Sequence, residues 1–124
     1  MDRMDYLKGI DHIQIAAPDS SEEQARHFYG ELLGMKEIPK PENLKARGGC
    51  WFQCGNQEVH IGIQKGFMPA KKAHPGFVVS SLAELKNDLE KAGYEIANEA
   101  PISGRERFFT FDPFGNRIEF LEFD

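Results

Sequence analysis

The sequence predicts an α+β fold built from two tandem copies of one unit, a strand and a helix followed by three strands. Apolar residues alternate in the segments assigned to strands and recur at helical spacing between them, in the same order in both halves. A glycine also ends the predicted helix of each half, Gly34 in the first and Gly93 in the second. We therefore expect one domain over residues 9–123, with units at roughly 9–64 and 73–123.

The first unit begins with a strand over residues 9–17, where β-branched residues follow a glycine. Residues 18–34 are predicted to form a helix, because a polar cap lies among residues 19–21 and acidic residues occupy the first turn. Three strands complete the unit, the last two joined by the two-residue Gly-Asn pair that is typical of tight hairpins. These strands are expected at residues 35–38, 49–54 and 58–64.

The second unit repeats this order after a loop at residues 65–73. Its helix is indicated by leucines that share one face, and its last strand reads RIEFLEF. The expected elements are a strand at 74–80, a helix at 82–93, and strands at 94–97, 107–112 and 117–123. In the last strand Glu122 falls on the side that faces the helix, near the chain end, where we expect it to reach water.

The hairpin defines which side chains share a face of the first unit. With a two-residue loop, Trp51 opposes His60 and Cys50 opposes Ile61. One face is then apolar and suited to pack under a helix, whereas the other carries polar groups. The polar face holds Trp51, Gln53, Glu58, His60 and Gly62.

Four metal-competent side chains fall on the polar face of the two units. Aligning the units superposes His12 on His74 and His60 on Glu119, so the four form two symmetry-related pairs. Imidazole nitrogens and a carboxylate oxygen suit zinc, nickel, manganese or iron. The sequence thus predicts a site for one divalent metal ion of unknown identity. The alternative is that the histidines line a ligand pocket without a metal.

Composition limits which kinds of partner and which compartment are expected for this protein. The formal net charge of −5 and a pI near 5.4 argue against binding to nucleic acid or to a membrane surface. No apolar run is long enough to cross a bilayer and the N-terminus lacks a secretory signal, so we expect a cytoplasmic protein. Cys50 and Cys54 lie on one face of a strand, about 13 Å apart, too far to form a disulfide. Reduced thiols fit a reducing compartment.

Four segments of the chain resemble a known superfamily: IDHIQIAAPD, FYGELLGMKEI, AHPGFVV and, most specifically, DPFGNRIEFLE. The chain resembles the vicinal oxygen chelate superfamily, which includes glyoxalase I, bleomycin-resistance proteins, fosfomycin-resistance thiol transferases and extradiol dioxygenases. The resemblance implies paired βαβββ units whose mixed sheet curls into a cup, with the helices on the outer face. It also implies a divalent metal held by the first and last strands of each unit.

Carried over residue by residue, the resemblance assigns His12, His74 and Glu119 to the ligand positions of the dioxygenase and fosfomycin-resistance branches. His60 matches the fourth ligand position, where glyoxalase I carries a glutamate. This departure argues against true glyoxalase I activity. His60 is expected to act as ligand or base, and Glu58, two residues away on the same face, is a second candidate base.

The predicted function is that of a metal-dependent enzyme acting on a small oxygenated substrate through chelation of its vicinal oxygens. Lyase or isomerase chemistry, thiol addition and dioxygenation all remain open. The alternative is a metal-free protein of the bleomycin-resistance kind that binds a drug or metabolite. The resemblance further implies a homodimer, with each cup formed either within one chain or from both.

Substrate contacts are expected from the polar face and the neighbouring loops. Gln14 shares the face of the predicted ligands, while Trp51 and Phe67 can wall a pocket. Arg107 lies at the start of a strand in the second unit, where it would pair with an anionic group. The substrate-binding prediction therefore comprises Gln14, Trp51, Phe67 and Arg107.

Overall fold

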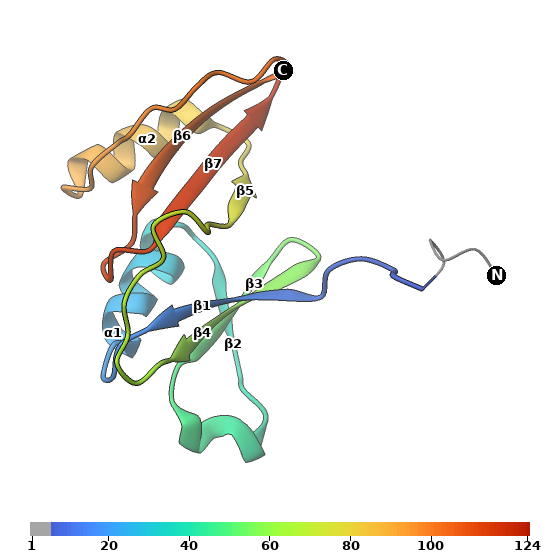
Figure 1. Ribbon diagram of the computed structural model, residues 1–124, viewed down its shortest axis with the longest axis vertical. Helices are drawn as coiled ribbons and strands as arrows, with labels where there is room; N and C mark the ends of the chain where they lie inside the picture. Colours follow the sequence, from blue (N-terminus) through green and yellow to red (C-terminus); the bar gives the residue numbers. More distant parts are fainter. Residues whose placement is uncertain (1–5) are drawn as a thin grey trace.

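The protein contains two β-sheets, with helices α1 and α2 on one side of them (Figure 1). This computed structural model describes residues 6–124. The arrangement confirms the predicted α+β class with a curled, open sheet in each half. Within residues 6–124, no helix combines the length and the apolar character that a membrane crossing requires.

The first sheet has four strands in the order β1–β4–β3–β2. Strand β1 runs parallel to β4, and the other neighbours are antiparallel. The predicted hairpin register is confirmed, because Trp51 pairs with His60 and Cys50 pairs with Ile61. The strands are β1 (His12–Ala17), β2 (Lys36–Ile38), β3 (Cys50–Cys54) and β4 (Gln57–Ile63).

The second sheet has three strands, in the order β5–β7–β6. The strand predicted at residues 94–97 is wrong: only Ala97 pairs, in an isolated bridge with Phe109. The ladder does not extend to residues 94–96, because the carbonyl of Glu95 accepts the hydroxyl of Thr110 at 2.6 Å instead of a strand N–H. The strands are β5 (Gly76–Val78), β6 (Arg105–Phe111) and β7 (Arg117–Phe123).

The first predicted helix has two parts. Helix α1 (Glu22–Ala25) continues into a π-helical segment (Arg26–Leu32), and the chain leaves it through Gly34, whose φ of 80° favours glycine. Ser21 is the N-cap residue, but its hydroxyl makes no capping hydrogen bond. The segment between β2 and β3 contains a 3₁₀ helix (Glu42–Arg47).

Helix α2 (Leu82–Lys91) forms where it was predicted. Its cap is Ser81, whose hydroxyl accepts the backbone N–H of Glu84 at 3.3 Å. A second acceptor is Glu122 of β7, whose carboxylate accepts the N–H of Leu82 at 2.8 Å. Glu122 is thus on the predicted helix-facing side, and its charge is stabilised by the N-terminus of α2 as well as by water.

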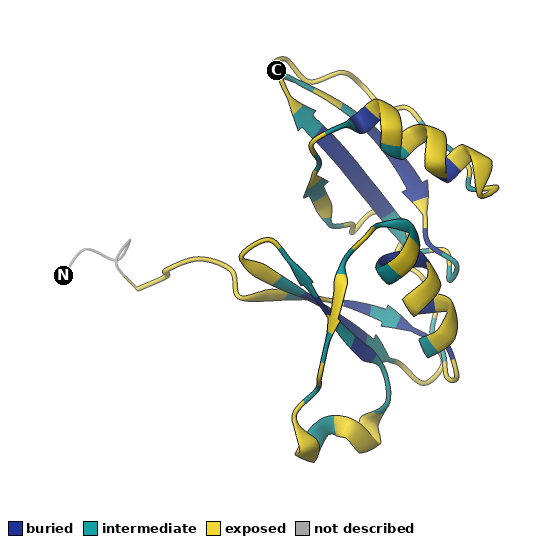
Figure 2. Cartoon of the chain, turned by 180° about the vertical axis from the view of Figure 1, so that it is seen from behind, coloured by how far each residue is buried: buried dark blue, intermediate teal, exposed yellow. Residues whose placement is uncertain are grey.

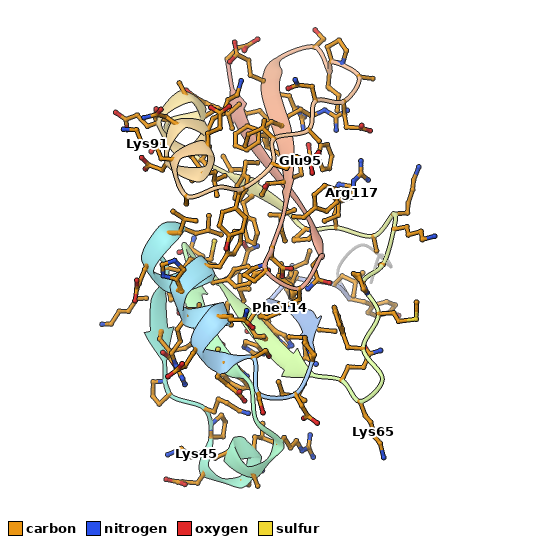
Figure 3. All side chains as sticks on the ribbon, turned by 90° about the vertical axis from the view of Figure 1, so that its left-hand side faces the viewer. Lys45, Lys65, Lys91, Glu95, Phe114 and Arg117 are labelled. Atoms are coloured by element: carbon orange, nitrogen blue, oxygen red, sulfur yellow. The ribbon has the colours of Figure 1, made fainter. Side chains whose placement is uncertain are left out.

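One hydrophobic core joins the two halves. Side chains from the helices, among them Phe28 and Leu89, pack against the inner faces of both sheets, while the outer faces of the helices are exposed (Figure 2). Phe114, in the turn between β6 and β7, lies where the halves meet (Figure 3). The core therefore occupies one face of each sheet, and the opposite faces are left for other contacts.

The turn that carries Phe114 also links the halves through polar contacts. The buried carboxylate of Asp112 accepts the N–H groups of Phe114 and Asn116 and the hydroxyl of Tyr29, the last at 2.6 Å. The amide of Asn116 donates to the carbonyl of Ala16 in β1 at 2.8 Å. This accounts for the DPFGN segment structurally, because it closes the β6–β7 turn and ties it to the first half.

Candidate functional site

The predicted ligands lie on the sheet faces opposite to the core, in two groups. His12 and His60 come from the neighbouring strands β1 and β4 of the first sheet. His74 lies just before β5, and Glu119 lies on β7 of the second sheet, where it pairs with Gly76. In each sheet, parallel pairing of a unit's first and last strands brings its two candidates to the same region of the face.

The second-sheet pair has the geometry of two ligands of one ion. Nε2 of His74 lies 3.0 Å from Oε1 of Glu119. Neighbouring ligands bound at about 2.0 to 2.2 Å in tetrahedral or octahedral geometry are separated by roughly 3 to 3.5 Å. The other ring nitrogen, Nδ1 of His74, donates to the carbonyl of Lys72 at 2.9 Å. This contact orients the ring and turns Nε2 toward the carboxylate.

The first-sheet pair is organised differently. The His60 ring is buried between two rings, Trp51 at 3.7 Å and His12 at 4.1 Å between centroids, both nearly parallel to it. Nε2 of His60 makes a hydrogen bond with Oε1 of Glu58 at 2.8 Å. Nδ1 of His12 contacts the Asp11 carboxylate at 2.9 Å. His12 therefore resembles His74, because in both an acceptor holds Nδ1 and leaves Nε2 for another partner.

The two pairs do not combine within one chain. Among residues 6–124, no three His, Cys, Asp or Glu side chains converge as the ligands of one ion would. The halves pack through their core faces, which share one hydrophobic cluster.

Two arginines accompany Glu119. Arg107 from β6 contacts its Oε2 at 3.4 Å, and Arg117 from β7 lies 3.4 Å from Nδ1 of His74. Both guanidinium groups lie over the ring of Phe109, with Cζ at 5.4 Å and 4.1 Å from its centroid. Sequence reasoning selected Arg107 but missed Arg117. The signal was present, because Arg117 precedes Glu119 by two residues and so shares its face.

The predicted substrate contacts line two hollows that share one residue. Gln14, Phe67, His74 and Arg117 line a cavity of about 360 Å³ between the start of the second sheet and the edge of β1. Gln14 and Trp51 line a second, of about 250 Å³, together with Lys40 and Arg47. Gly62 makes room for the Gln14 side chain, since a Cβ there would lie 2.6 Å from its amide nitrogen. Arg107 borders neither hollow.

The family model described as Glyoxalase/Bleomycin resistance protein/Dioxygenase superfamily matches residues 9–120. A comparison with curated proteins gives no match.

Among solved structures, a glyoxalase family protein from Bacillus anthracis shares 57% sequence identity, with 96% of this chain and 98% of that chain covered and a TM-score of 0.92. A glyoxalase/dioxygenase from Nostoc punctiforme is 18% identical, with 96% and 93% covered and a TM-score of 0.79. A lactoylglutathione lyase from Agrobacterium tumefaciens is 20% identical, with 94% and 95% covered and a TM-score of 0.71. The last two likenesses concern the fold alone.

Proposed function

The chain belongs to the glyoxalase/bleomycin resistance protein/dioxygenase superfamily, and on this premise we propose that it is a metal-dependent enzyme acting on a small oxygenated substrate. The observation that carries the proposal is the His74–Glu119 pair, with Nε2 and Oε1 3.0 Å apart and Nδ1 held by a carbonyl. His12, with the same disposition of its ring nitrogens, supplies the third ligand. A divalent zinc, nickel, manganese or iron ion would provide Lewis-acid polarisation of two adjacent substrate oxygens.

The protein's own groups would fix the ligands and handle protons. The Lys72 carbonyl and the Asp11 carboxylate hold the imidazoles in one tautomer, so that no reorientation is needed on binding. We assign proton transfer to Glu58, which is 31% exposed and reaches the polar face, whereas His60 is only 5% exposed. His60 holds Oε1 of Glu58 through Nε2, leaving Oε2 for the substrate proton.

A homodimer follows from this assignment. The ligand pairs of one chain lie on separate faces, so each site would combine His12 of one copy with His74 and Glu119 of the other. Such an isologous pairing of two different sheet faces gives two equivalent sites per dimer. Light scattering at micromolar concentration should give the mass of two chains; a monomer would contradict the shared site.

The test of the enzyme proposal is elemental analysis of protein purified without an affinity tag or added metal. We expect near-stoichiometric zinc, nickel, manganese or iron in the wild type and its loss in His74→Ala and Glu119→Ala. His27→Ala, which removes an exposed histidine of the first helical segment, is the matched control and should keep the metal. Binding of no ion, even on reconstitution with each of the four, would favour a metal-free binding protein.

The identity of the metal then directs the assay. Iron would be tested for dioxygenation by oxygen uptake, and the other ions for isomerase, lyase or thiol-addition chemistry. Loss of turnover in Glu58→Gln with retained metal is the expected signature of a base. Unchanged turnover in Glu58→Gln would remove Glu58 from the mechanism.

A further inference from the structure

We propose that Arg107 and Arg117 form a subsite for an oxyanion group of the substrate, so that this protein acts on a small organic acid. The inference rests on the proposed function, because it places the subsite beside the His74–Glu119 pair. The two arginines come from neighbouring strands, and the guanidinium group of each lies over the same ring, that of Phe109.

The strand register places this ring between the two arginines. Phe109 pairs directly with Glu119, Arg107 lies two residues before Phe109 on β6, and Arg117 lies two residues before Glu119 on the antiparallel β7. The guanidinium groups therefore approach the ring from opposite ends of the strand pair. A ligand held at Glu119 would have one cationic group on each side of it.

Both guanidinium groups are only partly solvated, and that of Arg117 has hydrogen-bonding capacity to spare. Arg107 and Arg117 are 15% and 17% exposed, respectively. The contacts of Arg117, to the Lys72 carbonyl, His74 and Glu99, are 3.2 to 3.4 Å long. Charge-assisted hydrogen bonds are usually about 2.7 to 2.9 Å long, so these contacts are loose.

One of these contacts is chemically mismatched. Nδ1 of His74 donates to the Lys72 carbonyl, yet Nη1 of Arg117 lies 3.4 Å from that same nitrogen. Two donors then face each other, and the guanidinium gains by turning to an acceptor. An oxyanion supplies two acceptor atoms in the planar geometry that a guanidinium binds best.

The local balance of charge also supports an oxyanion subsite. The two arginines are balanced by two carboxylates, Glu119 and the more exposed Glu99. A divalent ion bound at Glu119 would leave this neighbourhood with excess positive charge, which a neutral substrate would not offset. A carboxylate or phosphoryl group on the substrate would offset it.

The test compares two ligands of nearly the same shape, 3,4-dihydroxybenzoate and 3,4-dihydroxybenzamide. Both offer vicinal oxygens, and only the first is an anion. We expect the zinc-reconstituted wild type to bind the benzoate roughly tenfold or more tightly in calorimetric titrations, the scale of a charge-assisted contact in a partly buried site. Inorganic phosphate, added as a competitor, shows which kind of oxyanion the subsite prefers. If phosphate displaces the benzoate, the subsite is assigned to a phosphoryl group. If it does not, the subsite is assigned to a carboxylate.

Arg107→Met and Arg117→Met should each abolish most of this preference without lowering zinc content. Arg105→Met is the matched control, because Arg105 lies on the same strand and face but stacks on Phe123, about four residues along the sheet from Glu119. If a methionine variant does not fold, Arg107→Lys and Arg117→Lys are tested in its place. A reduced preference for the benzoate over the benzamide is expected in them, because lysine lacks the planar fork of arginine. An unchanged preference in these variants would overturn the proposal, as would no preference in the wild type.

The same titrations on metal-free protein separate this inference from the proposed function. If the protein binds no metal but its preference for the benzoate is lost in the arginine variants, the subsite stands and the enzyme proposal fails. If metal binds and the preference is absent, the enzyme proposal stands and the subsite fails.

Discussion

At the scale of residues, the site depends on which nitrogen of each histidine is free. His12 and His74, which belong to different halves, each have Nδ1 held by an oxygen acceptor supplied within two residues along the chain. His60 instead has Nε2 held by Glu58 and its ring packed between Trp51 and His12. The proposed roles differ accordingly: His12 and His74 bind the metal, and His60 supports the ring of His12.

His60→Phe tests this division. Phenylalanine keeps a flat ring between Trp51 and His12 but offers no nitrogen, so we expect the metal content and metal affinity to stay within about threefold of wild type. The replacement leaves Glu58 without its partner, and turnover should fall. Measurement is by competition with a metal-binding dye, with His12→Phe as the comparison. Loss of metal in His60→Phe equal to that in His12→Phe would make His60 a ligand.

At the scale of elements, strand β7 presents its two glutamates to opposite faces. Glu119 faces the candidate site, whereas Glu122 faces α2 and accepts the N–H of Leu82 at 2.8 Å. Glu122 also lies directly across from Glu106 on β6, a like-charged pair. The helix N-terminus therefore makes this second acidic position favourable.

Glu122→Ala and Glu106→Ala should have different effects on stability. Removing Glu122 takes an acceptor from the start of α2, and we expect a loss of about 0.5 to 2 kcal/mol in the free energy of unfolding. Removing the exposed Glu106 relieves repulsion and should change that free energy by less than about 0.5 kcal/mol, in the stabilising direction. Urea unfolding measures both, and equal losses would show that the contact between Glu122 and Leu82 contributes nothing.

At the scale of the whole molecule, a short polar network joins the two halves in addition to the shared core. The hydroxyl of Tyr29 donates to the buried carboxylate of Asp112, and Asn116 in the same turn donates to Ala16. Burial and the neighbouring Asp112 carboxylate raise the pKa of Tyr29 well above its ordinary value of 10.0. The phenol therefore stays protonated at neutral pH and keeps its role as donor.

Tyr29→Phe leaves Asp112 without this donor, and we expect a loss of about 1 to 3 kcal/mol in the free energy of unfolding at pH 7. Because the folded-state pKa of Tyr29 is raised, its contribution is fully present below pH 10 and is lost as the pH rises above that value. The difference in the free energy of unfolding between wild type and Tyr29→Phe should thus become smaller in alkaline solution. Denaturant titrations from pH 7 to 11 measure this difference. A difference that is constant with pH would refute the role of Tyr29 as a hydrogen-bond donor to Asp112.

Shared sites predict complementation between two inactive chains. When His12→Ala and Glu119→Ala are unfolded together and refolded, each mixed dimer would hold one site with both defects and one intact site. Random mixing should restore about a quarter of the wild-type metal sites, measured by elemental analysis. Each variant refolded alone is the control and should restore none. No recovery in the mixture would mean that each site draws its ligands from a single chain.

Three features could be predicted from sequence because they depend on local chemistry. The Gly-Asn turn predicts the hairpin, terminal glycines predict the helix ends, and the alternation of side chains along each strand predicts which face each side chain lies on. The strand expected at 94–97 could not be excluded, because its failure depends on the Thr110 hydroxyl binding the Glu95 carbonyl, a contact between two separate segments. The π-helical turn likewise carries no local signal.

The sequence by itself determined the two units and the composition of their polar faces, since the side-chain period of a strand is fixed by its backbone. Only the tertiary structure decided how those faces are placed. Both core faces belong to one buried cluster, because joining the two halves in one core removes apolar surface from water. That packing brings no three candidate ligands together within residues 6–124 and sets Arg117 beside His74, relations that no spacing along the chain specifies.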